Sequence, residues 1–544
     1  MDVILKHALA NAHRYGKADF KAVVSKVFGE QPELKKNARA VVEKVRKVVG
    51  EVNRMSARTV EKKLLELAPE LLHKEKREEV KELPPLEGVE DGVKLRLPPE
   101  PNGYLHMGHA LSFYLNYLYA SRYEGKLVLK FEDTNPLKEK KEYYRAIERD
   151  IEWLGIRWDE KFVLSEHFRE LRKGAEKLIE LGRAYVCTCP GEEASKGRRE
   201  LKADPCRNND KAKNMELWEE MLAGGRFVLR WKGDPKAKNS VLRDPTLYRV
   251  LDVKHPWTGE NHVVYPTYDF ASAVTDGLLG ITHVLRSEEF LMRAELHRAI
   301  ISSLGMKPPV YVHYGRFEME GTPTSKRLIR PLVEDGKVEG WDDPRLATLM
   351  ALRRRGIHPK TFEDLAKATG PYLGKSTITW ELLLGLNRKN IDPIAGRFFV
   401  VVDPVELKLD GPEVVAKLPL HPEAKGERKV KLAKRVFIDR SDYKDGKTLR
   451  LKGAYNIRIE KKRAVYAGNE LIRPIVHWVS DPAEATLVVA GKLFGNGKLQ
   501  KVKRKRVLAE RGLGSYKGEF VQMERVGFAR IDRRRPLELI FISD

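Results

Sequence analysis

One short stretch of this 544-residue chain, RLPPEPNGYLHMGH at positions 96–109, has residue types that suit phosphate chemistry. His106 and His109 lie three residues apart, so on a helix both rings face one side and can reach the same anion. Gly103 and Gly108 allow a phosphate to approach the backbone closely. Taken alone, the two histidines are also compatible with a metal pair or with ordinary surface residues.

The sequence on either side of this loop predicts the elements that position it. VKLRL from Val93 alternates like a strand, residues 110–125 carry the aromatic and leucine stripe of a helix, and KLVLKFED, ending at Asp133, is the next strand. This order is one βαβ unit of a parallel sheet, in which ligands bind beyond the carboxyl ends of the strands. The loop also enters a helix N-terminus, whose unpaired N–H groups favour a phosphate. We therefore expect a doubly wound, Rossmann-type α/β domain over 92–346, with a less regular subdomain inserted near 186–262.

Two helical segments and one β-rich segment flank this domain. Residues 1–85 carry apolar residues at three- and four-residue steps and end in a stiff Leu-Pro-Pro-Leu linker, which predicts a helical N-terminal module. Residues 347–395 predict a helical connector. Residues 396–544 contain short strands without intervening helices, which predicts C-terminal antiparallel β-barrels. The predicted fold class is multidomain α/β plus β.

Composition limits the possible functions. The chain has 102 Lys and Arg against 78 Asp and Glu, a formal charge of +24, which favours nucleic acid or an anionic membrane as partner. No run of about 18 apolar residues could span a membrane, and the N-terminus lacks the apolar core of a signal peptide. Three cysteines suit a reducing cytosol, so we expect a cytoplasmic protein.

Much of the positive charge lies near the C-terminus. Residues 396–544 contain 33 Lys and Arg against 19 Asp and Glu, and the densest run is 498–506. This run is either a solvated strand edge protected by lysines or a phosphate-binding surface. The excess over the whole segment favours phosphate binding.

Further polar residues follow the ends of other predicted strands in a fixed order. Glu132 ends the strand after the first helix, Tyr268 follows the inserted subdomain, and Arg286 ends the strand ITHVLR. The last member is Thr324-Ser325-Lys326-Arg327. With the first loop, this ordered set resembles the class I aminoacyl-tRNA synthetases, and most of all their glutamyl and glutaminyl subgroup.

Two signatures carry the resemblance. His106-Met-Gly-His109 is similar to the first signature, usually His-Ile-Gly-His, and Thr324–Arg327 is similar to a Lys-Met-Ser-Lys-Ser variant, with Thr324 in place of the usual Met or Leu. The resemblance implies that His106 and His109 donate to the α-phosphate of ATP, and that Lys326, aided by Ser325, neutralises the outer phosphates, with Mg²⁺ accompanying ATP. The ATP-binding residues that it implies are Pro101, Asn102, Gly103, His106, Gly108, His109, Arg316, Phe317, Thr324, Ser325 and Lys326.

The resemblance also implies a glutamate site made of Arg96, Glu132, Tyr268 and Arg286. Glutaminyl relatives read Leu-Cys-Thr where this chain has Leu285-Arg286-Ser287. A guanidinium forms two charged hydrogen bonds with a carboxylate and has no acceptor for an amide, so we expect glutamate as substrate. The alternative for Arg286 itself is a structural salt bridge. The alternatives for the whole protein are a glutaminyl-tRNA synthetase and a tRNA-binding paralogue without catalysis.

The β-rich segment resembles the two-barrel anticodon-binding region of archaeal and eukaryotic members. Arg397, Gln522 and Arg525 match anticodon-contacting positions of glutaminyl relatives, and the inserted subdomain is expected to bind the acceptor end. The short N-terminal module favours the archaeal type. The implied partners are L-glutamate, tRNA(Glu) and, as in many archaea, also tRNA(Gln), with no membrane; the sequence indicates no protein partner.

Three cysteines form a candidate metal site. Cys187, Cys189 and Cys206 have a spacing that suits zinc, but three sulfurs fall short of the usual four ligands. The alternative is a degenerated zinc knuckle that retains three thiols. Elsewhere, Gly374–Thr377 is similar to the end of a phosphate-binding P-loop, but Thr369 occupies the position of its first glycine, so we exclude it.

Overall fold

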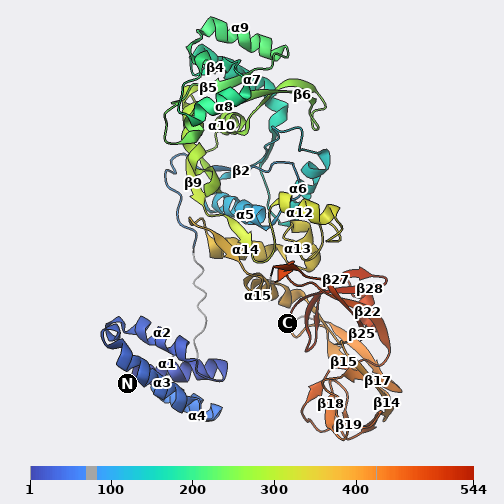
Figure 1. Ribbon diagram of the computed structural model, residues 1–544. Helices are drawn as coiled ribbons and strands as arrows, with labels where there is room; N and C mark the ends of the chain where they lie inside the picture. Colours follow the sequence, from blue (N-terminus) through green and yellow to red (C-terminus); the bar gives the residue numbers. More distant parts are fainter. Residues whose placement is uncertain (1, 69–81, 424–425, 496) are drawn as a thin grey trace. The chain divides into compact units, whose positions relative to one another are not determined.

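The computed structural model describes residues 2–68, 82–423, 426–495 and 497–544 (Figure 1). The chain forms two compact units, Met1–Lys81 and Glu82–Asp544. None of the described helices has the length and apolar character needed to cross a bilayer.

The N-terminal unit is helical, as predicted. The unit has a separate hydrophobic core. In the helix Ala38–Val52, Val41, Val45, Val48 and Val52 recur at helical spacing and are all buried in that core. The side chain of Ser56 caps the last helix by accepting a hydrogen bond from the backbone N–H of Thr59. The α-helices that the structure describes in this unit are α1 (Asp2–Tyr15), α2 (Phe20–Glu30), α3 (Ala38–Val52) and α4 (Ala57–Leu67).

A parallel sheet begins the second unit and confirms the predicted βαβ unit. Strand β1 pairs with β2 in parallel register, and β2 with β3. The backbone N–H of Thr282 donates to Lys94 O at 3.0 Å, so the parallel pair β8–β9 continues the sheet beside β1. The three-stranded sheet β3-β2-β1 thus has the two-stranded parallel sheet β8-β9 next to β1. Its elements are β1 (Lys94–Leu97), α5 (Met107–Arg122), β2 (Lys126–Phe131), α6 (Lys141–Trp153), β3 (Glu160–Val163), β8 (His283–Ser287), α11 (Ala294–Ser303) and β9 (Val310–Tyr314).

Between β3 and β8 the chain builds an antiparallel sheet of four strands in the order β4-β5-β6-β7 (Figure 1). The last strand leads directly into α10, which carries Tyr268 as its first residue. The elements of this segment are α7 (Phe168–Glu180), β4 (Ala184–Cys187), α8 (Gly191–Arg199), α9 (Lys211–Leu222), β5 (Val228–Trp231), β6 (Thr246–Lys254), β7 (Asn261–Pro266) and α10 (Tyr268–Leu278).

Helices dominate the segment after β9. Before β9, residues 288–303 begin as a 3-10 helix, Glu288–Arg293, and become α-helical from Ala294. Strands β10 and β11 pair in parallel across the segment after β9. Its elements are β10 (Phe317–Met319), α12 (Lys326–Glu334), α13 (Leu349–Arg355), α14 (Pro359–Thr369), β11 (Ser376–Ile378) and α15 (Trp380–Ile391).

The C-terminal β-region corrects the prediction of antiparallel barrels, because its two large sheets are mixed. Parallel pairs join β12 to β26, β22 to β28, β14 to β20 and β18 to β21. Each parallel pair is separated in sequence by other strands, which make the crossover that a helix makes in an α/β domain. The absence of helices between strands therefore did not exclude parallel pairing. Seven strands follow the order β12-β26-β27-β28-β22-β25-β13, and six follow β17-β14-β20-β19-β18-β21.

The strand bounds of the β-region are β12 (Gly396–Phe398), β13 (Val400–Val401), β14 (Pro404–Asp410), β15 (Val414–Pro419), β16 (Glu427–Leu432), β17 (Arg435–Asp439), β18 (Thr448–Leu451), β19 (Asn456–Glu460), β20 (Arg463–Tyr466), β21 (Ile475–Val476), β22 (Pro482–Val489), β23 (Phe494–Gly495), β24 (Lys498–Leu499), β25 (Lys503–Glu510), β26 (Phe520–Met523), β27 (Gly527–Arg534) and β28 (Leu537–Ser543).

Candidate active site

The two signature histidines cap helix α5. The backbone N–H of Gly108 donates to His106 Nδ1, and the backbone N–H of His106 donates to His109 Nδ1, each at 3.1 Å. Because both Nδ1 atoms accept, each neutral ring carries its proton on Nε2. A Cβ at position 108 would lie 3.0 Å from His106 Cε1, so glycine keeps this cap tight. The loop thus presents two imidazole N–H donors, with ring centroids 3.8 Å apart.

Both histidines are neutral at physiological pH. Burial, with help from the positive charges of Lys326 and Arg316, lowers the pKa of His106 to about 3. Burial and the neighbouring His106 hold the pKa of His109 well below its ordinary value. The pair can therefore donate hydrogen bonds to a phosphate, but it does not add positive charge at neutral pH.

Lys326 begins helix α12 and lies against the first loop. Its Nζ donates to the side-chain oxygen of Asn102. A Cβ at Gly103 would come within 2.8 Å of the Lys326 side chain, so glycine leaves room for that chain. Burial, with a contribution from Arg330, lowers the pKa of Lys326 to about 8. The two signatures, far apart in sequence, therefore meet in the structure.

A cavity of about 620 Å³ collects most of the predicted substrate residues. Ser325 and Lys326 do not line it, nor do Pro101, Asn102 and Gly103. The predicted residues that line the cavity are Arg96, His106, Gly108, His109, Glu132, Tyr268, Arg286, Arg316, Phe317 and Thr324.

A buried network of charges forms one wall of this site. Arg96 Nε donates to Asp276 Oδ1 at 3.2 Å, and Lys130 Nζ donates to the same oxygen at 2.6 Å. Lys130 Nζ also lies 3.0 Å from Glu132 Oε1. Burial alone would raise the pKa of Asp276, but Arg96 and Lys130 lower it to about 2. The network therefore fixes the positions of the Arg96 and Glu132 side chains in this wall.

Three side-chain atoms of the predicted glutamate-binding residues are buried without a hydrogen-bond partner among the described residues; Arg249 Nε on the same cavity and Asp276 Oδ2 in the network are two more. The three are two donors, Arg96 Nη1 and Arg286 Nε, and one acceptor, Glu132 Oε2. Buried polar atoms normally have partners, and an unpaired one costs about 1–3 kcal/mol. A ligand with carboxylate and ammonium groups would satisfy all three.

Sequence reasoning missed several polar residues around this wall. Ser272 Oγ donates to Glu132 Oε1 at 2.9 Å, and Asp276 anchors Arg96. The signal was present, because Tyr268, Ser272 and Asp276 follow one another at four-residue steps and share one face of α10. The stripe could have been identified from the sequence YDFASAVTD, but it also suits ordinary helix packing.

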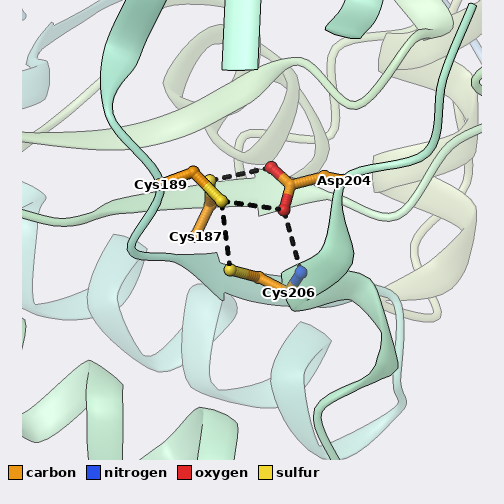
Figure 2. Close-up of side chains that lie close together, drawn as sticks. All are labelled: Cys187, Cys189, Asp204 and Cys206. Carbon is orange, nitrogen blue, oxygen red and sulfur yellow. Dashed lines mark hydrogen bonds between the residues drawn. The ribbon is translucent and has the colours of Figure 1, made fainter. Parts of the chain in front are cut away.

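The three cysteines come together and gain a fourth candidate ligand, Asp204 (Figure 2). Cys189 Sγ and Cys206 Sγ are 3.6 Å apart, and the ligand atoms of all four residues lie within 4.8 Å of one another. Two sulfurs bound to one tetrahedral zinc are about 3.8 Å apart, from a Zn–S distance of about 2.3 Å. The donor set therefore fits zinc, and Asp204 is the candidate ligand that the cysteine spacing alone did not indicate.

In the β-region, Arg397 and Gln522 are register partners on the parallel strands β12 and β26. Arg397 Nη2 donates to Asp392 Oδ1 at 2.6 Å. Arg525 lies in the turn after β26, has a positive φ of 65°, and pairs through both Nη atoms with Asp442 at 2.6 and 3.0 Å. The three predicted anticodon residues thus come from neighbouring elements.

Comparisons with known proteins agree with this geometry. The family described as "tRNA synthetases class I (E and Q), catalytic domain" matches residues 92–393, and "tRNA synthetases class I (E and Q), anti-codon binding domain" matches residues 395–472. The glutamate--tRNA ligase of Korarchaeum cryptofilum is 40% identical, over 100% of this chain and 99% of that protein. Those of Pyrococcus furiosus and Methanopyrus kandleri are each 39% identical, covering 97% and 98% of this chain and 96% of each relative. The chain therefore belongs to the class I tRNA synthetases of the E and Q group, in the family of glutamate--tRNA ligases.

Proposed function

We propose that this chain attaches glutamate to tRNA(Glu) through a glutamyl-adenylate, with the residue roles given below. The observation that carries the glutamate assignment is the set of unpaired atoms Arg96 Nη1, Arg286 Nε and Glu132 Oε2 in one cavity wall. Glutamate supplies one ammonium for Glu132 and two carboxylates for the arginines, with the side-chain carboxylate on Arg286. Tyr268 closes the same wall, and burial, followed by the charge of Glu132, raises its pKa to about 12, so it is a neutral donor.

The reaction needs the glutamate α-carboxylate to attack the α-phosphorus of ATP and release pyrophosphate. The neutral Nε2–H groups of His106 and His109 are preorganised donors for the charge that develops on the α-phosphate oxygens. Lys326, at the N-terminus of α12, and Ser325 face the outer phosphates, and Arg316 and Phe317 flank the adenine. ATP enters with Mg²⁺, held mainly by phosphate oxygens and water. The 2′-hydroxyl of the terminal tRNA adenosine then attacks the glutamyl carbonyl carbon, loses its proton and takes the acyl group, and AMP leaves.

The tRNA is proposed to contact three further parts of the chain. The antiparallel subdomain at 186–262 binds the acceptor end of the tRNA. The helices of 347–395 connect the catalytic domain to the β-region, which reads the anticodon with Arg397, Gln522 and Arg525. We also propose that tRNA(Gln) is charged with glutamate, because the two tRNA sets share two anticodon bases and a permissive site need ignore only the third. Charging of purified tRNA(Gln) with glutamate tests this, and no acceptance would mark a discriminating enzyme.

ATP–pyrophosphate exchange with tRNA present tests the central proposal. Glutamate should support exchange and glutamine should not, since only glutamate satisfies Arg286. Exchange driven by glutamine would favour a glutaminyl enzyme, and no exchange with either would favour a non-catalytic tRNA-binding protein. Asp276→Asn, which leaves Arg96 and Lys130 without their shared anion, should raise the KM for glutamate more than that for ATP.

We further propose that Cys187, Cys189, Asp204 and Cys206 hold a structural zinc ion, which would cross-link two loops of the inserted subdomain. Metal content of the purified protein is the direct readout. Cys206→Ser and Asp204→Asn should lose zinc, whereas Thr188→Ala, which alters a neighbouring non-ligand 3.6 Å from Cys206 Sγ, should keep it. Wild-type protein without zinc after growth in zinc-replete medium would contradict the proposal.

A further inference from the structure

The side chain of Arg286 is held by neutral partners. This inference rests on the proposed role of Arg286 in binding the substrate side chain. Arg286 is 5% exposed, and no described carboxylate forms an ion pair with it within 4.0 Å. Its Nη2 donates to Phe290 O at 3.2 Å, and its Cζ lies 4.7 Å from the ring centroid of Tyr311. A buried guanidinium normally has an anionic partner, so this arrangement reserves its charge for a ligand.

The third contact of Arg286 is with a buried histidine on α11. Arg286 Nη1 lies 3.4 Å from His297 Nδ1, and His297 is fully buried. A guanidinium has donors only, so His297 Nδ1 must be the acceptor and must carry no proton. The proton of the neutral ring therefore resides on Nε2.

Asp269, on α10, favours the same tautomer. His297 Nε2 lies 3.1 Å from Asp269 Oδ1, and a carboxylate accepts only from a protonated nitrogen. Arg293 pairs with the other oxygen of Asp269, which keeps that carboxylate ionised. Asp269, His297 and Arg286 thus form a directed chain of hydrogen bonds.

We propose that His297 is a positioning residue for substrate selection: oriented by Asp269, it fixes the guanidinium of Arg286 so that Nε faces the glutamate side chain. Two contacts, at Nη1 and Nη2, determine the plane of the guanidinium. Nε is the donor left without a described partner, and with the second N–H of Nη2 it forms the edge that can grip a carboxylate with two bonds. Without His297 Nδ1, the guanidinium could rotate on its flexible stem and lose this alignment.

Paired amide substitutions test the proposal. In His297→Asn the side-chain oxygen occupies the topological position of Nδ1 and can still accept from Arg286. In His297→Gln the amide moves one carbon toward Asp269 and leaves no acceptor at that position; His297→Leu removes both polar atoms. We expect His297→Gln and His297→Leu to lower kcat/KM for glutamate by about tenfold, the lower end of the range for one hydrogen bond to a charged group, and to lower the glutamate-to-glutamine selectivity similarly. His297→Asn should keep most of that selectivity.

The KM for ATP and thermal unfolding of each variant separate positioning from general damage. Equal losses with Asn and Gln, or unchanged selectivity with Gln and Leu, would overturn the role of His297. If His297→Leu does not fold, the Asn and Gln pair alone decides, because both keep a polar amide. Arg286→Cys measured in parallel tests the underlying assignment: if it too leaves selectivity unchanged, the proposed glutamate site is wrong, whereas a loss there with normal His297 variants rejects only the positioning role.

Discussion

Lys326 Nζ donates a hydrogen bond to Asn102 Oδ1, across 224 residues of sequence. The contact joins the start of α12 to the loop before α5, so Lys326, the cation proposed to bind the phosphates, lies against the loop that leads to the histidine donors. A phosphate that binds Lys326 competes with a neutral amide oxygen, and an anionic oxygen is the stronger acceptor. ATP can therefore replace this contact favourably.

The phosphate-facing donors should control the rate of adenylate formation. His109→Ala and Lys326→Ala should each slow it by about 10²–10³, the usual effect of losing one preorganised charge-stabilising donor. The rate of ATP–pyrophosphate exchange with tRNA present measures this. Lys337→Ala, which removes an exposed lysine paired with Asp335, is the matched control and should be near wild type. Near-normal rates in both active-site variants would contradict the assignment.

The lowered pKa of Lys326, about 8, predicts an alkaline limb in the pH profile. Below this pH the ammonium is charged and binds phosphate; above it the amine is neutral, so kcat/KM for ATP should fall as pH rises through about 8. The limb in kcat should lie higher, because bound phosphate favours the charged form. Lys326→Arg stays charged across this range and should lose the limb even if its activity is lower. Profiles of the two enzymes with the same midpoint would assign the limb to another group.

Amino-acid choice should depend on Arg286. Arg286→Cys should lower kcat/KM for glutamate by about 1.5–3 kcal/mol, or about tenfold to a few hundredfold, the range for hydrogen bonds to charged groups. Glutamine should lose less, because its amide cannot accept from both guanidinium donors. Steady-state kinetics with both amino acids would decide, and equal losses would make Arg286 a structural residue.

Arg525 should contribute to tRNA selection. Two hydrogen bonds to the buried Asp442 hold its guanidinium in one orientation. Arg525→Ala removes this oriented donor, and Asp442→Asn weakens the contact that orients it. Both should raise the KM for tRNA and leave the KM for glutamate unchanged. Arg511→Ala, an exposed arginine paired with Asp481, is the charge-matched control. The tRNA affinity should also fall with salt, with a slope of roughly 0.7–0.9 per phosphate neutralised, and affinity independent of salt would refute an electrostatic interface.

The sequence predicted the parts of this molecule that depend on local patterns. The strand at 94–97, the helix from Met107 and the strand at 126–131 follow from alternation and helical periodicity, and the parallel pairing follows from their order. The mixed pairing in the β-region could not be predicted, because short strands with similar patterns fit either direction. The sequence did not indicate Asp204 or Asp276 as site residues, for a different reason. Asp276 binds Arg96 and Lys130, which are 180 and 146 residues away in sequence. Asp204 lies only two residues before Cys206, but one acidic residue in a loop carries no signal by itself.

The formal charges of the proposed glutamate site and of its substrate can also be added. Five buried side chains, three cations and two anions, form its charged wall: Arg96, Lys130, Arg286, Glu132 and Asp276. Free glutamate carries one negative charge overall, so its binding brings the assembly to electroneutrality. Glutamine is neutral overall and would leave one uncompensated cation in a medium of low dielectric constant, where isolated charge is costly. Under the proposed assignment, charge compensation in the buried site therefore adds to the geometric fit of Arg286 in favouring glutamate over glutamine.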